Sequence, residues 1–127
     1  MLSITALYVG LFMLLLLVLA IGVVRQRLST QTSMGDGGHL SLIKAMRAHG
    51  NAIEYVPVVL IGLAVLELNS GNGLLLHLYG SAFLIARFSH AFGMQLTNEG
   101  NNFRKVGVVL TWLVMLAMGV HLIASTF

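Results

Sequence analysis

Cysteine is absent from the sequence, and charged residues are scarce. The 127 residues include no cysteine, 9% of them are charged and 57% are hydrophobic. Without cysteine the chain can form no disulfide, no metal thiolate and no thiol nucleophile of its own, so any sulfur chemistry must come from a substrate. A soluble domain usually has about 25% charged residues. The shortage of charge therefore indicates that the solvent of this chain is the bilayer.

Charge is missing completely from both ends of the sequence. Residues 1–24 and 106–127 contain no Asp, Glu, Lys or Arg, and each run is about as long as the 20 residues that a helix needs to cross the hydrocarbon. A cleaved signal peptide would start with basic residues, whereas here Arg25 and Arg27 follow the apolar run. We therefore expect a retained first span. Because this span has no acidic residue for coupling protons, a small four-span drug exporter is disfavoured.

Two further apolar segments lie between these ends. We expect helices at about 4–24, 40–68, 74–96 and 104–125, joined by a polar linker that begins at Gln26 and by turns at 69–73 and 97–102. Short connections favour antiparallel neighbours. The sequence therefore predicts a single all-α domain over residues 1–127, an integral membrane four-helix up-down bundle.

The cations all gather toward one end of the predicted bundle. They come from the first linker, the start of the second segment and the region around the last turn: Arg25, Arg27, Lys44, Arg47, Arg87, Arg104 and Lys105. Because basic loops stay in the cytoplasm, we expect this end to be cytoplasmic and both termini to lie outside. The net charge of +3 is small, and the basic residues are spread over several span ends rather than forming one patch, so no nucleic-acid partner is indicated. The histidines outside the motifs show no metal-ligand spacing, and we expect no metal site.

The stretch RAHGNAIEYVP, near the start of the second segment, is very polar for a membrane helix. With helical spacing, Arg47, Asn51 and Glu54 share a face within about 60° of arc, and Tyr55 lies beside them. An ionisable group inside a membrane costs about 3 kcal/mol, so such groups tend to pair or to line a cavity. One interpretation is structural, with Arg47 or Glu54 paired to each other or to Arg87. Snorkelling of Arg47 to the interface is another.

Ligand binding better explains why the polar groups cluster at one end. The row on the second segment offers a guanidinium, an amide and a carboxylate, and Arg87 and Arg104 lie toward the same end. Arginine binds carboxylates in bidentate fashion, and a carboxylate accepts an ammonium group. The combination fits a small zwitterionic peptide that has more than one carboxylate.

These residues resemble the motifs of the MAPEG family, the membrane-associated proteins of eicosanoid and glutathione metabolism. The pattern R-x-H-x-N-x-x-E-Y-x-P, which begins at Arg47, is similar to the signature of the family's second helix. ARFSH (86–90) looks like its third-helix arginine motif, and RKVGVVLT (104–111) like the start of its fourth helix. The pattern is most like that of a small bacterial member, in the inner or plasma membrane. The resemblance implies a homotrimer with glutathione bound between neighbouring subunits, near the cytoplasmic face.

The resemblance also implies roles for particular residues. Arg104 matches the catalytic arginine that faces the thiol, and Arg87 matches a family arginine whose role is structural. A looser alignment matches either Arg25 or Arg27 to a first-helix arginine that reaches the peptide. The implied glutathione-binding set is Arg25, Arg47, Asn51, Glu54, Tyr55 and His90.

A membrane-bound glutathione transferase or peroxidase is the implied activity, with glutathione as co-substrate. A free thiol has a pKa of about 8.5, and a nearby arginine lowers that pKa by favouring the thiolate. The thiolate would attack a hydrophobic electrophile among the membrane lipids or reduce a lipid hydroperoxide. Met94 stands where several relatives have tyrosine, and Lys105 where one catalytic relative has serine. A non-catalytic lipid-binding or scaffold membrane protein of the same fold is therefore the alternative.

Overall fold

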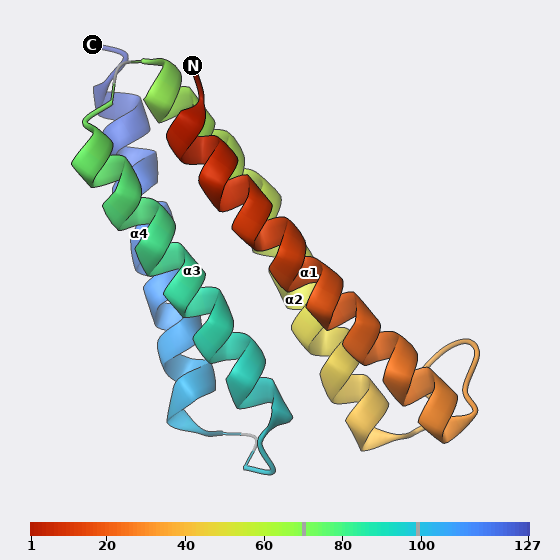
Figure 1. Ribbon diagram of the computed structural model, residues 1–127. Helices are drawn as coiled ribbons and strands as arrows, with labels where there is room; N and C mark the ends of the chain where they lie inside the picture. Colours follow the sequence, from red (N-terminus) through yellow and green to blue (C-terminus); the bar gives the residue numbers. More distant parts are fainter. Residues whose placement is uncertain (70, 99) are drawn as a thin grey trace.

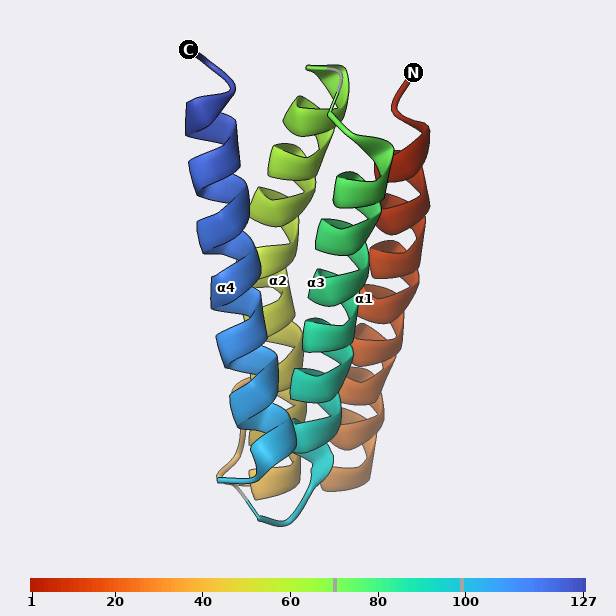
Figure 2. The same ribbon diagram turned by 90° about the vertical axis from the view of Figure 1, so that its left-hand side faces the viewer.

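Four helices, each antiparallel to the one before it in the sequence, make up the computed structural model, which describes residues 1–69, 71–98 and 100–127. Both termini lie at one end of the bundle, here called the terminal end (Figure 1 and Figure 2). The α1–α2 linker and the α3–α4 connection lie at the other, here called the basic end. Among the described residues there is no strand, and the prediction of an all-α up-down four-helix bundle is confirmed. The helices are α1 Ser3–Thr30, α2 Leu40–Leu68, α3 Gly73–Gln95 and α4 Asn102–Ala124.

The helices α1, α2 and α4 are long and apolar enough to cross a membrane, judged by length and composition. The helix α3 has 23 residues, as many as α4, and packs along it. Both α2 and α3 pack against every other helix, whereas in the part of the chain that is described no Cα atom of α1 lies within 8 Å of one in α4. In Figure 1 the α1–α2 pair and the α3–α4 pair lie close together at the terminal end and separate toward the basic end.

The first helix is longer than the sequence predicted. We expected the span to end near residue 24 and the linker to begin at Gln26, but α1 continues to Thr30. It ends at Gln31, whose φ of 52° is left-handed, a common way for a helix to stop. The guanidinium of Arg27 donates to the carbonyl oxygens of Thr32 and Gly35, at 3.3 and 2.9 Å. Polar residues after the apolar run therefore extend the helix. The hydrogen bonds of Arg27 then hold the start of the linker against the end of α1.

The bounds of α2 are as expected, whereas the start of α1 and the bounds of α3 and α4 differ from the expected ones by one or two residues, within the usual uncertainty of helix ends. The two turns expected at 69–73 and 97–102 contain residues 70 and 99, which lie outside the described residues.

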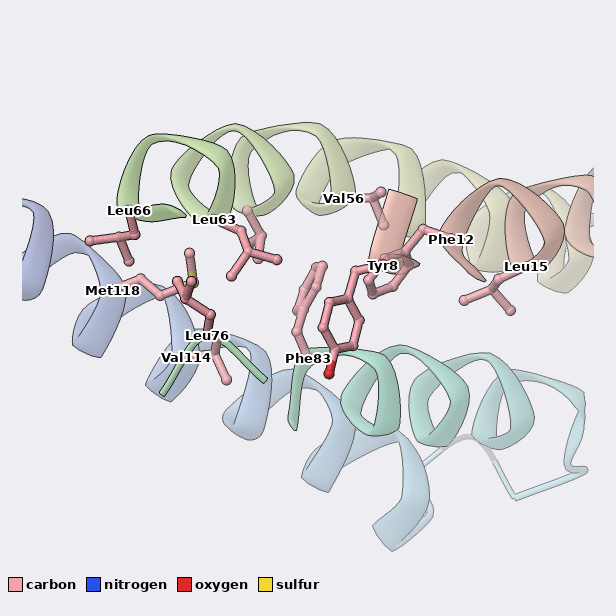
Figure 3. Packing of buried hydrophobic residues seen from close by; sticks show 11 residues of the cluster. Tyr8, Phe12, Leu15, Val56, Leu63, Leu66, Leu76, Phe83, Val114 and Met118 are labelled. Atoms are coloured by element: carbon pink, nitrogen blue, oxygen red, sulfur yellow. The ribbon is translucent and has the colours of Figure 1, made fainter. Parts of the chain in front are cut away.

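The hydrophobic core fills the terminal half and the middle of the bundle (Figure 3). Phe12 of α1 and Phe83 of α3 are almost fully buried, with ring centroids 5.0 Å apart. Next to them, the ring of Tyr8 lies so close to Gly80 that a Cβ on this glycine would overlap it. Small residues allow this close helix approach in membrane proteins, where helix association depends on packing.

A carboxylate holds the first two helices together at the terminal end. Both oxygens of Glu67, near the end of α2, accept backbone N–H groups of α1, from Ile4 at 2.9 Å and from Thr5 at 2.7 Å. The first N–H groups of a helix have no partner within the helix, and they carry its positive dipole end. The half-buried Glu67 therefore satisfies two of these groups and fixes the register between α1 and α2.

Candidate functional site

Two arginines from different helices line one cavity at the basic end. The cavity has a volume of about 190 Å³ and lies between the start of α2, the end of α3 and the start of α4. Arg47 of α2 and Arg104 of α4 both line it, together with Lys44 and Met94. The two arginine side chains are exposed, whereas Met94 is buried. We call this the Arg47–Arg104 cavity.

The position of Arg104 depends on the residues that start α4. The side-chain oxygen of Asn101 accepts the backbone N–H of Arg104 at 3.0 Å, as an N-cap. The amide group of the same Asn101 donates to the carbonyl oxygen of Gly93, at 2.8 Å, and thereby links the start of α4 to the end of α3. A Cβ on Gly93 would lie 2.6 Å from the backbone nitrogen of Arg104. Only glycine therefore allows α3 and α4 to approach closely enough to place Arg104 beside Met94.

A buried arginine, Arg87, links three helices close to the Arg47–Arg104 cavity. Arg87 of α3 is only 2% exposed. Its guanidinium donates to the side-chain oxygen of Asn51 at 2.6 Å and to the carbonyl oxygen of Gly107 at 3.3 Å. It also lies 5.2 Å from the centroid of the Tyr55 ring, within the range of a cation–π interaction. Arg87 thus joins α2, α3 and α4 and fixes two of the predicted glutathione-binding residues, Asn51 and Tyr55.

These contacts also set the hydrogen-bonding direction of Asn51 and Tyr55. A guanidinium has no acceptor, so the amide oxygen of Asn51 must face Arg87 and its NH₂ group is left for another partner. The indole of Trp112, which can only donate, reaches the hydroxyl oxygen of Tyr55 at 3.2 Å. The hydrogen of that hydroxyl is therefore free to be donated elsewhere. Both side chains are set to donate, which favours a ligand rich in acceptors.

His90 lies one turn further along α3 than Arg87 and is 5% exposed. It packs against the start of α4, where a Cβ on Gly107 would come within 2.7 Å of the Cβ of His90. His90 does not line the Arg47–Arg104 cavity, whereas Met94, one turn later, does. Met94, at the position where the motif resemblance leads us to expect tyrosine, thus lies in the cavity wall and brings a thioether in place of a hydroxyl.

The remaining predicted residues lie apart from this cavity within the single chain. Glu54 is exposed on α2. Arg25 is exposed on α1 and lines a different cavity, between α1 and α3. Arg27, the other candidate for this role, is occupied by the linker carbonyls. The described residues contain no group of three or more His, Cys, Asp or Glu side chains that could hold a metal ion.

A model of the MAPEG family matches residues 5–124, which is nearly the whole chain. The chain belongs to the MAPEG family. It is similar to Inner membrane protein YecN of Escherichia coli strain K12, with 34% identity over 115 residues that cover 91% of this chain and 86% of the relative. YecN of Escherichia coli O6:H1 strain CFT073 gives the same identity and coverage. No solved structure matches the chain significantly. The resemblance inferred from the motifs is confirmed, and the chain is a membrane protein of this family.

Sequence reasoning did not identify two residues that shape the site, Asn101 and Trp112. Asn101 could have been found, because asparagine directly before a helix is a common N-cap. The contact of Trp112 with Tyr55 joins residues 57 positions apart, and no local pattern indicates it. Arg87 was expected to be structural, and its contacts with Asn51 and Gly107 agree with that interpretation.

Proposed function

We propose that the protein is a membrane-bound glutathione transferase, with glutathione peroxidase activity as a variant of the same chemistry. The observation that carries this proposal is the meeting of Arg47 and Arg104 in one cavity. These two residues come from motifs 57 positions apart in the sequence. Membership in a family of glutathione and eicosanoid metabolism supports the choice of thiol.

Glutathione has two carboxylates, one ammonium group and two peptide bonds, and within one subunit the basic end has a group for all of these except one carboxylate. Arg47 binds a carboxylate in bidentate fashion. Glu54 accepts the ammonium group, and the NH₂ group of Asn51 and the hydroxyl of Tyr55 donate to the peptide oxygens. Since Glu54 is exposed, it meets the ligand at the surface of the subunit. His90 of α3 is buried and does not line the Arg47–Arg104 cavity, so its part in this proposal is to pack behind the residues that bind the ligand.

A homotrimer completes the site in this proposal. Arg25 is directed away from the Arg47–Arg104 cavity within one subunit, because it lines the space between α1 and α3. The Arg25 that binds glutathione is therefore supplied by a neighbouring subunit. With the basic end in the cytoplasm and both termini outside, glutathione enters from the cytoplasm and the hydrophobic electrophile from the bilayer.

The chemistry needs a cation close to the sulfur. Arg104 favours the thiolate over the thiol, and the thiol proton passes to water. In the transferase reaction the thiolate attacks an electrophilic carbon, a carbon–sulfur bond forms and the leaving group departs with its electron pair. In the peroxidase reaction the sulfur attacks the outer oxygen of a lipid hydroperoxide and the O–O bond breaks, releasing the lipid alcohol. A second glutathione then displaces that oxygen as water and yields glutathione disulfide.

A non-catalytic lipid-binding or scaffold membrane protein of the same fold is the second candidate. The observation that favours it is Met94, which is buried in the cavity wall and supplies no hydroxyl to orient the thiol.

Conjugation of glutathione to a generic aromatic halide distinguishes the two candidates. We expect the purified protein in detergent to form the conjugate and Arg104→Ala to lose that activity. Lys105→Ala is the matched control, because it removes the neighbouring exposed cation, which does not line the cavity. Equal activity in Arg104→Ala and Lys105→Ala would refute the role of Arg104. Glutathione binding without any conjugation would favour the scaffold.

A further inference from the structure

A larger cavity opens between α1 and α3 in the half of the bundle that leads to the basic end. Its volume is about 520 Å³, within the range of small-molecule sites. Of the predicted glutathione-binding residues only Arg25 lines it. We call this cavity the α1–α3 groove and define it by six of its lining residues: Leu15, Leu19, Gly22, Arg25, Phe88 and Phe92.

The groove changes from apolar to cationic along its length. Leu15 and Leu19 of α1 and the two phenylalanines of α3 line its apolar part, whereas Arg25, Gln26 and Gln95 line the part near the basic end. The two glutamines also line an adjoining cavity of about 340 Å³, to which α2 contributes Lys44. No acidic side chain is among the described residues that line either cavity.

Lys44 is held in place beside this polar part. Its ammonium group donates to the carbonyl oxygen of Leu96 at 2.9 Å. An ammonium group has three N–H donors, so two remain for an anion. Arg25 of the groove and Lys44 of the adjoining cavity thus offer two cations to a negatively charged group where the two cavities meet.

The length of the groove matches one leaflet of a bilayer. From Leu15 to Arg25 the helix α1 rises about 15 Å, at about 1.5 Å for each residue. This is half of the hydrocarbon thickness of about 30 Å. Along the same stretch, Val18 and Ile21 are 64% and 50% exposed, so the groove is bordered by side chains that face lipid. An acyl chain beside α1 would place its headgroup at the level of Arg25.

From this depth and charge we propose that the α1–α3 groove binds an anionic phospholipid of the leaflet at the basic end. One acyl chain packs against Leu19 and Phe88, and the phosphate lies between Arg25 and Lys44. Basic pockets between transmembrane helices are known to bind acidic lipid headgroups. The site goes beyond the proposed transferase, because the phospholipid is not consumed, and its apolar part lies outside the Arg47–Arg104 cavity. At its polar end it shares Lys44 with that cavity and Arg25 with the proposed trimer site.

Native mass spectrometry in detergent tests the proposal with phosphatidylglycerol, and with phosphatidylcholine as the neutral comparison. We expect the wild type to retain phosphatidylglycerol in preference to phosphatidylcholine. Gly22→Leu should reduce this retention to the phosphatidylcholine level, because a Cβ at Gly22 meets nothing within 4 Å and a leucine there fills the groove. Gly10→Leu is the matched control on the same helix, where a Cβ also meets nothing within 4 Å. Equal retention by the two variants would overturn the proposal.

The charge of the site is tested separately. A Lys or Arg near an anionic lipid surface contributes about 1 kcal/mol, so Lys44→Gln should lower the preference for phosphatidylglycerol about fivefold. An unchanged preference would contradict the proposed headgroup position. These measurements use no glutathione, so their failure leaves the proposed transferase untouched.

A second copy of the chain is the other possible occupant of the groove. Because the sequence has no cysteine, Gly22→Cys introduces a single thiol in the groove wall. We expect a lipid-linked thiol reagent in the bilayer to label this cysteine in the assembled protein. Disulfide-linked dimers and protection from the reagent would instead assign the groove to a neighbouring subunit and overturn the lipid site.

Discussion

Polar side chains link neighbouring helices at both ends of the bundle, but at the basic end cations also line cavities. Glu67 accepts two N–H groups of α1, and the hydroxyl of Tyr8 donates to the carbonyl oxygen of His77 at 3.0 Å. At the basic end Arg47 and Arg104 line a cavity, and Lys44 borders a second one. The α1–α2 pair and the α3–α4 pair lie close together at the terminal end and diverge toward the basic end, while the helices within each pair stay in contact (Figure 1).

This difference indicates how stability and binding are divided along the bundle. The core around Phe12 and Phe83 lies toward the terminal end and the middle, and stabilises the fold through packing. At the basic end Arg47 and Arg104 are exposed and line a cavity, where their charges can bind an anion. Substitutions at the terminal end should therefore change stability, and substitutions at the basic end should change binding and catalysis.

The largest expected loss of stability comes from Gly80→Leu. The leucine side chain would overlap the ring of Tyr8, and overpacking of this kind costs about 3 kcal/mol. The melting temperature should fall clearly, whereas Gly10→Leu, which adds the same side chain in open space, should leave it unchanged. Glutathione affinity of the folded fraction should stay at the wild-type value. A large loss of affinity without a loss of stability would contradict the division between the two ends.

The second prediction concerns Arg87→Met, which removes the donor to Asn51 and Gly107. Asn51 then loses the contact that fixes its amide, and we expect glutathione to bind about tenfold more weakly, equivalent to about 1.4 kcal/mol. Calorimetric titration with glutathione measures this change. Arg87→Lys keeps the charge but not the planar fork, so it should restore the affinity only in part. Full affinity in Arg87→Met would show that Asn51 takes no part in binding.

Asn101→Ala should reduce stability less than Gly80→Leu, and its effect should be confined to the start of α4. Loss of an N-cap destabilises a protein by about 1 kcal/mol, and here it also frees the start of α4 from Gly93. We expect the kcat of conjugation to fall more than the KM changes, because Arg104 loses its position while Arg47 keeps its own. Asn102→Ala, at the next and exposed position, is the control. Identical kinetics in both variants would argue against this role of Asn101.

The smallest effect is expected from Glu67→Gln at the terminal end. The amide keeps one acceptor oxygen but loses the negative charge beside the N-terminus of α1. The melting temperature should fall by about 2 °C, with glutathione conjugation unchanged. A loss of activity larger than the loss of stability would show that the two ends are coupled.

Much of the fold could be predicted from the sequence, because each feature rests on a local pattern. The charge-free runs predicted the first and last helices, and the positions of the cations predicted which end of the bundle is basic. The predicted end of α1 was wrong, since the polar residues after Val24 still form helix up to Thr30. The cap of α1 by Glu67 joins residues 63 and 62 positions apart, and a sequence pattern carries no information on such a contact.

The candidate site was predictable in part. Helical spacing put Arg47 and Asn51 on one face, but the structure directs them to different neighbours, Arg47 to the cavity and Asn51 to Arg87. Spacing along a helix predicts the face on which a side chain lies. Which residue that side chain contacts depends on how α3 and α4 pack against the helix. The assignment of Arg25 to glutathione needs the neighbouring subunit, and both the homotrimer and the bound glutathione stay predictions.

The most direct test of the account is the ultraviolet difference spectrum of glutathione bound to the purified protein in detergent. A thiolate absorbs where a thiol does not, so the spectrum reports the protonation state of the bound sulfur. We predict a thiolate signal at neutral pH in the wild type and in Lys105→Ala, and no signal in Arg104→Ala at saturating glutathione. A bound thiol that stays protonated in the wild type, or a thiolate that survives Arg104→Ala, would contradict the central claim that the basic end activates glutathione.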